Sequence, residues 1–171
     1  MLLAAEGVTI LRLGRLLTLH FFIGMLLVGP VALKAGSTIY RFGRYYAGSA
    51  PYRRKGPPAP LLRLLGPVVI ASTAGVFGTG IVLAIAGPAH RQPWLFLHKA
   101  SFVIWFCAMT VHVLAYLPRL PGLVAAESRG AAGLGGRGVR VSLLLASLVA
   151  GLVIAMLTVH LAGPWHFGRS G

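Results

Sequence analysis

Four apolar stretches, each about as long as the hydrocarbon core of a bilayer is thick, constrain this 171-residue chain more than any other feature. They cover residues 16–33, 64–86, 95–117 and 141–161, and a membrane-spanning helix requires about 20 apolar residues. Hydrophobic residues make up 57% of the chain and charged residues only 11%, which is too little charge for a soluble domain of this size. The sequence therefore predicts an all-α fold, a single integral membrane domain over residues 1–171 that forms an up-down-up-down four-helix transmembrane bundle.

The 16 lysines and arginines lie mostly in two of the predicted loops, residues 34–63 and 118–140. Because cytoplasmic loops are enriched in these residues, we expect both loops in the cytoplasm and both chain termini outside, in the plasma membrane of a bacterium. Anionic membrane lipids are the expected partners of such a basic belt. The formal charge of +14 does not indicate nucleic-acid binding, because no soluble reading domain accompanies it.

Residues 1–15 are apolar around Glu6, and their arginines follow the apolar part instead of preceding it. A signal peptide has the opposite order, so we expect an interfacial lead-in and a retained first span. The single cysteine, Cys107, lies within the third span, where we expect a small buried packing residue. The only acidic residues, Glu6 and Glu127, lie outside the predicted spans. Since coupled transporters normally bury carboxylates, transport and carboxylate-based catalysis are disfavoured.

Two histidines, His98 and His112, lie 14 residues apart in the third apolar stretch. On an α-helix this spacing returns to within about 40° of the starting direction and rises roughly 21 Å, so both side chains would face the same side. His20 lies about as far from the outer end of the first span as His98 lies from that of the third, which predicts equal depth. A haem inside a helix bundle needs inward-facing imidazoles at matched depth. His20 and His98 are therefore the predicted axial pair of a haem b.

Other ligand pairings stay open at this point. His160, at the outer end of the fourth span, could substitute for either member of the pair. His112 could ligate a second haem near the cytoplasmic boundary, but no other histidine of the chain lies at that level. If the first helix begins near Val8, His20 moves to mid-depth and could face His112 instead.

Several neighbours of these histidines suit a cofactor pocket. Phe102 begins an apolar stripe on the face between His98 and His112, which is typical of plain core packing and also of a porphyrin edge. Lys99 could extend to the membrane surface or pair with a haem propionate. Gly24, one turn after His20, would leave room for a flat macrocycle, although close helix packing also explains glycines in membrane spans.

The chain resembles the bacterial membrane-embedded b-type cytochromes that serve formate dehydrogenases and nickel–iron hydrogenases. The resemblance rests on LHKASF at residues 97–102, on the thirteen residues between His98 and His112, and on His20. The chain is also similar to four-span actinobacterial membrane proteins with segments like YRFGRYY and RRKGPP, here residues 40–46 and 53–58.

The resemblance implies electron transfer between quinol and a partner redox enzyme through two haems, with His98 and His112 at one level each. Because this chain has no second histidine at the level of His112, we expect one haem b, with two as the alternative, and a quinone as a further ligand. The protein would be an electron-transfer subunit without a complete catalytic site of its own. The rival interpretation is a non-haem membrane protein, an assembly factor or structural subunit whose histidines form only interhelical hydrogen bonds.

Overall fold

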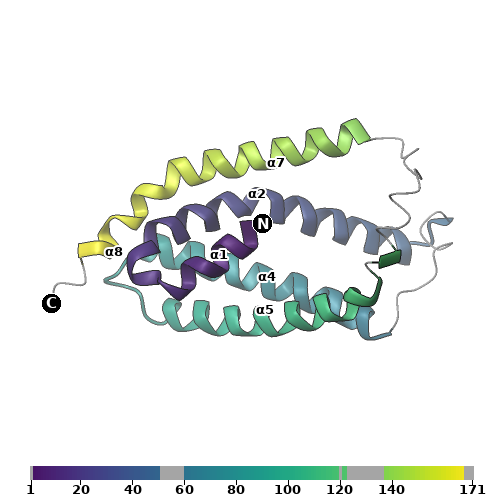
Figure 1. Ribbon diagram of the computed structural model, residues 1–171, viewed down its shortest axis with the longest axis horizontal. Coiled ribbons are helices and arrows are strands. Elements are labelled where there is room, and N and C mark those ends of the chain that lie inside the picture. The colour runs from purple at the N-terminus through teal and green to yellow at the C-terminus, as the bar shows by residue number, and fades with distance from the viewer. Residues whose placement is uncertain (1, 51–59, 120, 123–136, 168–171) are drawn as a thin grey trace.

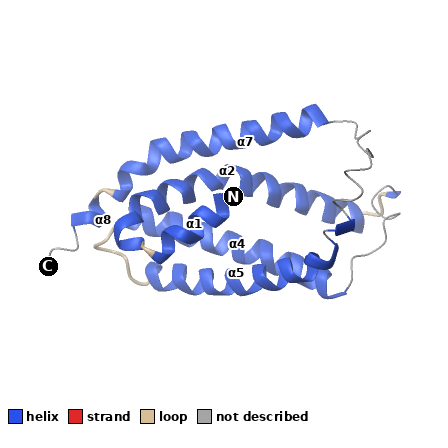
Figure 2. Cartoon of the chain, viewed as in Figure 1, coloured by secondary structure: helices blue, strands red, loops and turns tan. Residues whose placement is uncertain are grey.

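The computed structural model describes residues 2–50, 60–119, 121–122 and 137–167, and within these residues all regular structure is helical (Figures 1 and 2). The elements are α1 (Leu2–Leu11), α2 (Leu13–Tyr46), α4 (Pro60–Ala86), α5 (Trp94–Tyr116), the 3₁₀ turn η1 (Leu117–Arg119), α7 (Arg137–Thr158), the 3₁₀ turn η2 (Val159–Ala162) and α8 (Pro164–Phe167). Helices α2, α4, α5 and α7 are each long and apolar enough to cross a membrane. The predicted four-helix transmembrane bundle is thereby confirmed, and the chain is a multi-pass membrane protein.

The bundle consists of two helix pairs. α2 packs along α7 and α4 packs along α5, whereas direct contacts between α2 and α4 are sparse. Figure 1 shows the α2–α7 pair and the α4–α5 pair running side by side along the long axis, with α8 and the α4–α5 turn at the same end. The turn is tight because Gly87, at φ +70°, ends α4 in a conformation that only glycine adopts freely.

Small residues bring α2 and α7 into direct backbone contact. A Cβ atom built at Gly29 of α2 would overlap the carbonyl oxygen of Ser147 of α7, and one built at Gly151 of α7 would overlap that of Leu26 of α2. Ala155, one turn beyond Gly151, is fully buried. Close approach of this kind is how membrane helices associate, because the surrounding lipid removes the hydrophobic drive for association.

The two pairs meet in a small apolar cluster. Met25 of α2, Ala84 of α4 and Ala155 of α7 are buried together, and partly buried side chains such as Phe22 and Ile81 pack against them. Most other apolar side chains of the spans are exposed on the bundle surface, as expected where the surroundings are lipid.

The first span is longer than predicted. The sequence analysis ended it at residue 33 and began a cytoplasmic loop at residue 34, but α2 continues to Tyr46 and has 34 residues, or about 51 Å. Within this polar end the hydroxyls of Ser37 and Thr38 donate to the Lys34 carbonyl, a back-bonding that hydroxyl side chains adopt inside helices. Gly48, at φ +84°, then terminates it. Two parts of the predicted loops lie outside the described residues: 51–59, which include the whole RRKGPP segment, and 123–136 of the second loop.

Two further expectations were wrong. The N-terminal segment is not an interfacial lead-in: α1 turns back at Arg12 and packs along α2, so that the start of the chain lies near the middle of the bundle's length in Figure 1. Cys107 is exposed, because it lies on the face of α5 that carries the exposed Val103 and Phe106. On a helix Cys107 lies about 180° from His98, so the inward-facing histidines already indicate this lipid-facing side, and the expectation of burial overlooked it.

The orientation of the bundle remains a prediction from charge, and fusion proteins in a bacterial host can test it. The positive-inside rule places the α8 end outside. Alkaline phosphatase fused after the last residue should therefore be active, and a green fluorescent protein fused there should be dark. The same reporters placed after Gly48 should give the reverse pattern, and an inverted result at both sites would overturn the orientation.

Candidate functional site

His98 is held in one orientation by α4. Its Nδ1 lies 3.1 Å from the Val76 carbonyl oxygen and 3.2 Å from Thr79 Oγ1. The Thr79 hydroxyl already donates to the Gly75 carbonyl at 2.6 Å, and a carbonyl oxygen can only accept. Nδ1 of His98 therefore carries the proton and donates to Val76, which leaves the lone pair of a neutral ring on Nε2.

Gly80 makes room for this ring. A Cβ atom at Gly80 would lie 3.0 Å from Cε1 and 3.3 Å from Nδ1 of His98, closer than ordinary van der Waals contact. The imidazole of His98, which belongs to α5, therefore packs directly against the backbone of α4 at Gly80. Thr79 continues the polar contact between the two helices, since its hydroxyl lies 3.1 Å from that of Ser101.

His20 of α2 is held by α1 in a parallel way. Its Nδ1 lies 2.9 Å from Glu6 Oε1 and 3.0 Å from Thr9 Oγ1. The Thr9 hydroxyl donates to the Glu6 backbone carbonyl at 2.6 Å, and a carboxylate accepts only. Nδ1 of His20 is therefore the protonated nitrogen as well, and its Nε2 is turned away from Glu6.

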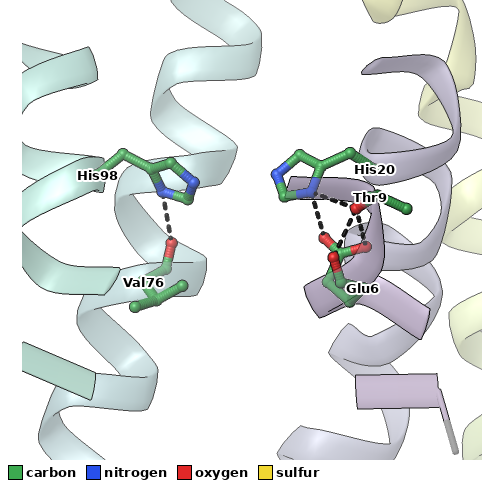
Figure 3. Close-up of polar contacts among 5 residues, drawn as sticks. All are labelled: Glu6, Thr9, His20, Val76 and His98. Atoms are coloured by element: carbon green, nitrogen blue, oxygen red, sulfur yellow. Dashed lines mark hydrogen bonds and ion pairs between the residues drawn. The ribbon is translucent and has the colours of Figure 1, made fainter. Parts of the chain in front are cut away.

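The two rings face each other across the space between the helix pairs. Figure 3 shows His20 and His98 at the same level, with the partners of their Nδ1 atoms drawn below the rings and the Nε2 atoms directed toward one another. Neither Nε2 has a hydrogen-bond partner in the described part of the chain. α2 begins at Leu13, so the alternative in which a helix starting near Val8 turns His20 toward His112 does not occur.

Two opposed imidazole lone pairs suit a metal whose other positions are already filled. The described residues contain no group of three or more His, Cys, Asp or Glu side chains that could hold a bare metal ion, whereas protein zinc sites use three or four such ligands. A haem iron needs only two axial ligands from the protein. Metal-bound histidines also characteristically donate their second ring nitrogen to a carbonyl or carboxylate, as both rings do in this bundle.

The other two candidate ligands, His112 and His160, make none of the contacts of this pair. His112 is on the same helix as His98, and its Nδ1 is buried without a hydrogen-bond partner among the described residues. Its ring packs on Tyr116 at a centroid distance of 4.9 Å. The side chain of His160 in η2 is exposed. The structure thus brings neither of them into the contacts that join His20 and His98 to their partners.

The other predicted site residues, Phe102, Lys99 and Gly24, lie in different surroundings. Phe102 is half-buried and stacks on Trp105 and Phe106 at centroid distances of 6.1 and 6.0 Å. Lys99 is exposed. Gly24 lies against α1, because a Cβ atom there would be 3.3 Å from Glu6 Oε1. Its missing side chain leaves space for the carboxylate of Glu6, so close packing against α1 accounts for this glycine.

Sequence reasoning missed the two residues that support His20. Glu6 was assigned outside the spans, and Thr9 was not singled out, although Thr9 is 99% buried with a relative exposure of 1%. The available signal was their spacing of three residues, which puts a carboxylate and a hydroxyl on one face of a short apolar helix. Two polar side chains on one face of an apolar helix indicate a polar partner on the helix that packs against that face.

No family model, curated protein sequence or solved structure matches this chain.

Proposed function

We propose that this protein is a haem b-binding membrane cytochrome subunit that carries electrons between the quinone pool and a partner oxidoreductase. The observation that carries the proposal is the facing arrangement of His20 and His98, in which each Nδ1 is engaged by an acceptor. In their neutral form the two rings would present their Nε2 lone pairs at one level of a membrane bundle, where the two residues could hold a haem iron.

His20 and His98 would hold the iron, and one haem is expected. Bound in this way, a haem supplies a site that accepts and releases a single electron. The chain's own residues orient the two imidazoles, hold the proton of each ring on Nδ1 through the acceptors there, and surround the site with apolar helices. Arg12 and Arg15 line a shallow depression at the α1–α2 turn, where their guanidinium groups could pair with anionic propionates.

A second candidate function is favoured by one contact. The Glu6–His20 pair at 2.9 Å would also satisfy a protonated His20 as an ordinary interhelical ion pair. In that case the protein is a non-haem structural subunit or assembly factor, and the purified protein is colourless.

The deciding experiment is a dithionite-reduced minus oxidised visible spectrum of the detergent-purified protein, expressed with ample haem and quantified per chain. Sharp b-type bands at one haem per chain would support the His20–His98 site. Two haems per chain would assign a second site to His112. A featureless spectrum would overturn the cytochrome proposal and leave the structural subunit.

Gly80→Ala should weaken haem retention without unfolding the bundle. The added methyl group would lie 3.0 Å from His98 Cε1, and the ring cannot move away without stretching its bond to Val76. Because loss of a supporting contact behind a metal ligand costs about 10–100-fold in affinity, we expect a reduction of about tenfold, measured by haem titration. Gly78→Ala is the matched control, since nothing lies within 4 Å of a Cβ atom there. Equal affinities in the two variants would contradict the role of Gly80.

A further inference from the structure

The supports behind the two facing histidines differ in charge. His98 Nδ1 donates to the neutral carbonyl of Val76 at 3.1 Å, whereas His20 Nδ1 lies 2.9 Å from the carboxylate of Glu6. Glu6 is one of only two acidic residues in the chain. One imidazole thus has a neutral acceptor behind it and the other has a charged acceptor, so the two rings are not equivalent.

The Glu6 carboxylate is built into the bundle by several contacts. Its side chain is 16% exposed, and Thr9 Oγ1 lies 3.4 Å from its second oxygen. Gly24 on α2 leaves the space that the carboxylate fills. A half-buried carboxylate is costly unless it is paired and hydrogen-bonded, so these contacts indicate a specific position for the charge.

The carboxylate of Glu6 belongs to α1, a short helix that does not span the membrane. α1 has 10 residues, too few to span a bilayer, and it packs chiefly on α2. Its fold-back places the Glu6 carboxylate at the Nδ1 edge of the His20 ring, while Nε2 is directed toward His98, as Figure 3 shows. α1 therefore delivers one negative charge to one side of the site.

We propose that Glu6 is a positioning residue that fixes the Nδ1-protonated form of His20 and lowers the reduction potential of the bound haem. This inference rests on the proposed function. A carboxylate behind a ligating imidazole raises the basicity of the ligand, and a fixed negative charge in a low-dielectric interior favours the more positive oxidised state of the iron. The neutral carbonyl of Val76 affects the basicity of His98 and the charge of the iron less than a carboxylate would. The two histidines would therefore differ in basicity as ligands.

Glu6→Gln tests the proposal, because glutamine keeps the size of the side chain and removes the charge. We expect the midpoint potential, measured by redox titration of the visible spectrum, to rise. At a fixed potential the ratio of reduced to oxidised haem should be at least tenfold higher in the variant than in the wild type. For a one-electron couple a tenfold change is about 59 mV. Glu127→Gln removes the same charge from the chain's other acidic residue and should leave the equilibrium within about twofold of the wild type. Glu6→Asp restores the charge and should reverse part of the shift.

The outcomes separate this inference from the function on which it rests. A wild type without haem would overturn both. A haem-loaded wild type whose potential is unchanged by Glu6→Gln would overturn the role of Glu6 alone. If Glu6→Gln fails to retain haem, nitrogen-15 spectra of histidine decide, recorded on the haem-free wild type and on haem-free Glu6→Leu, which removes the acceptor altogether because a glutamine carbonyl could still accept from Nδ1. Loss of the Nδ1-protonated form of His20 in the variant supports the proposal, and identical spectra overturn it.

Discussion

His98→Ala is expected to abolish nearly all haem binding. Removing a partner behind a metal ligand already costs about 10–100-fold in affinity, so removing the ligand itself should cost more than about 100-fold. His20→Ala should have an equal effect, because the two Nε2 atoms face the same space (Figure 3). The measurement is haem per chain in the purified variants, together with the reduced-minus-oxidised spectrum.

Three controls make this result specific. His90→Ala removes an exposed histidine from the turn between α4 and α5, and it should leave the haem content at the wild-type level. His112→Ala should do the same if a single haem binds. Added imidazole should restore part of the haem to His98→Ala, since the small molecule can occupy the space of the lost ring. Wild-type haem content in His98→Ala would contradict the axial assignment.

The four spans were predictable because the length of an apolar stretch, compared with the thickness of the hydrocarbon core, determines them. A helix rises 1.5 Å per residue and the hydrocarbon core is about 30 Å thick, so apolar stretches of about 20 residues identify the helices. The end of α2 was missed for the same reason. Its last turns, rich in Arg and Tyr, lie beyond the apolar stretch, and the point at which they stop depends on the turn at Gly48.

The facing of His20 and His98 followed from counting residues, because helices that run in the same direction place equal offsets at equal depth. The supports behind them did not follow. Val76 contributes only its backbone carbonyl, which any residue type carries, and Gly80 is one of 23 glycines in the chain. Glu6 reaches His20 only because the chain reverses at Arg12, and hydropathy averaged over a span-length window does not detect such a reversal. The role of the pair as haem ligands stays a prediction.

Gly151→Leu is expected to separate α2 from α7 and to destabilise the bundle by about 3 kcal/mol or more, the upper end for overpacking a tight core. The side chain would be driven into the Leu26 carbonyl and toward Gly29, and a helix backbone cannot yield as a flexible side chain would. The cluster of Met25, Ala84 and Ala155, which joins the two helix pairs, lies one turn away and would be disrupted in turn. Thermal unfolding in detergent should show a large drop in the midpoint.

The matched control is Gly78→Leu, the same substitution in α4 at a position where nothing lies within 4 Å of an added Cβ atom. Gly78 is exposed on the bundle surface, so its new side chain should enter lipid or detergent at little cost. Comparable losses in the two variants would mean that a leucine at any span glycine is harmful, and the close contact of α2 with α7 would not be the cause. If only Gly151→Leu unfolds early and also loses haem, the α2–α7 contact is what holds His20 in register with His98.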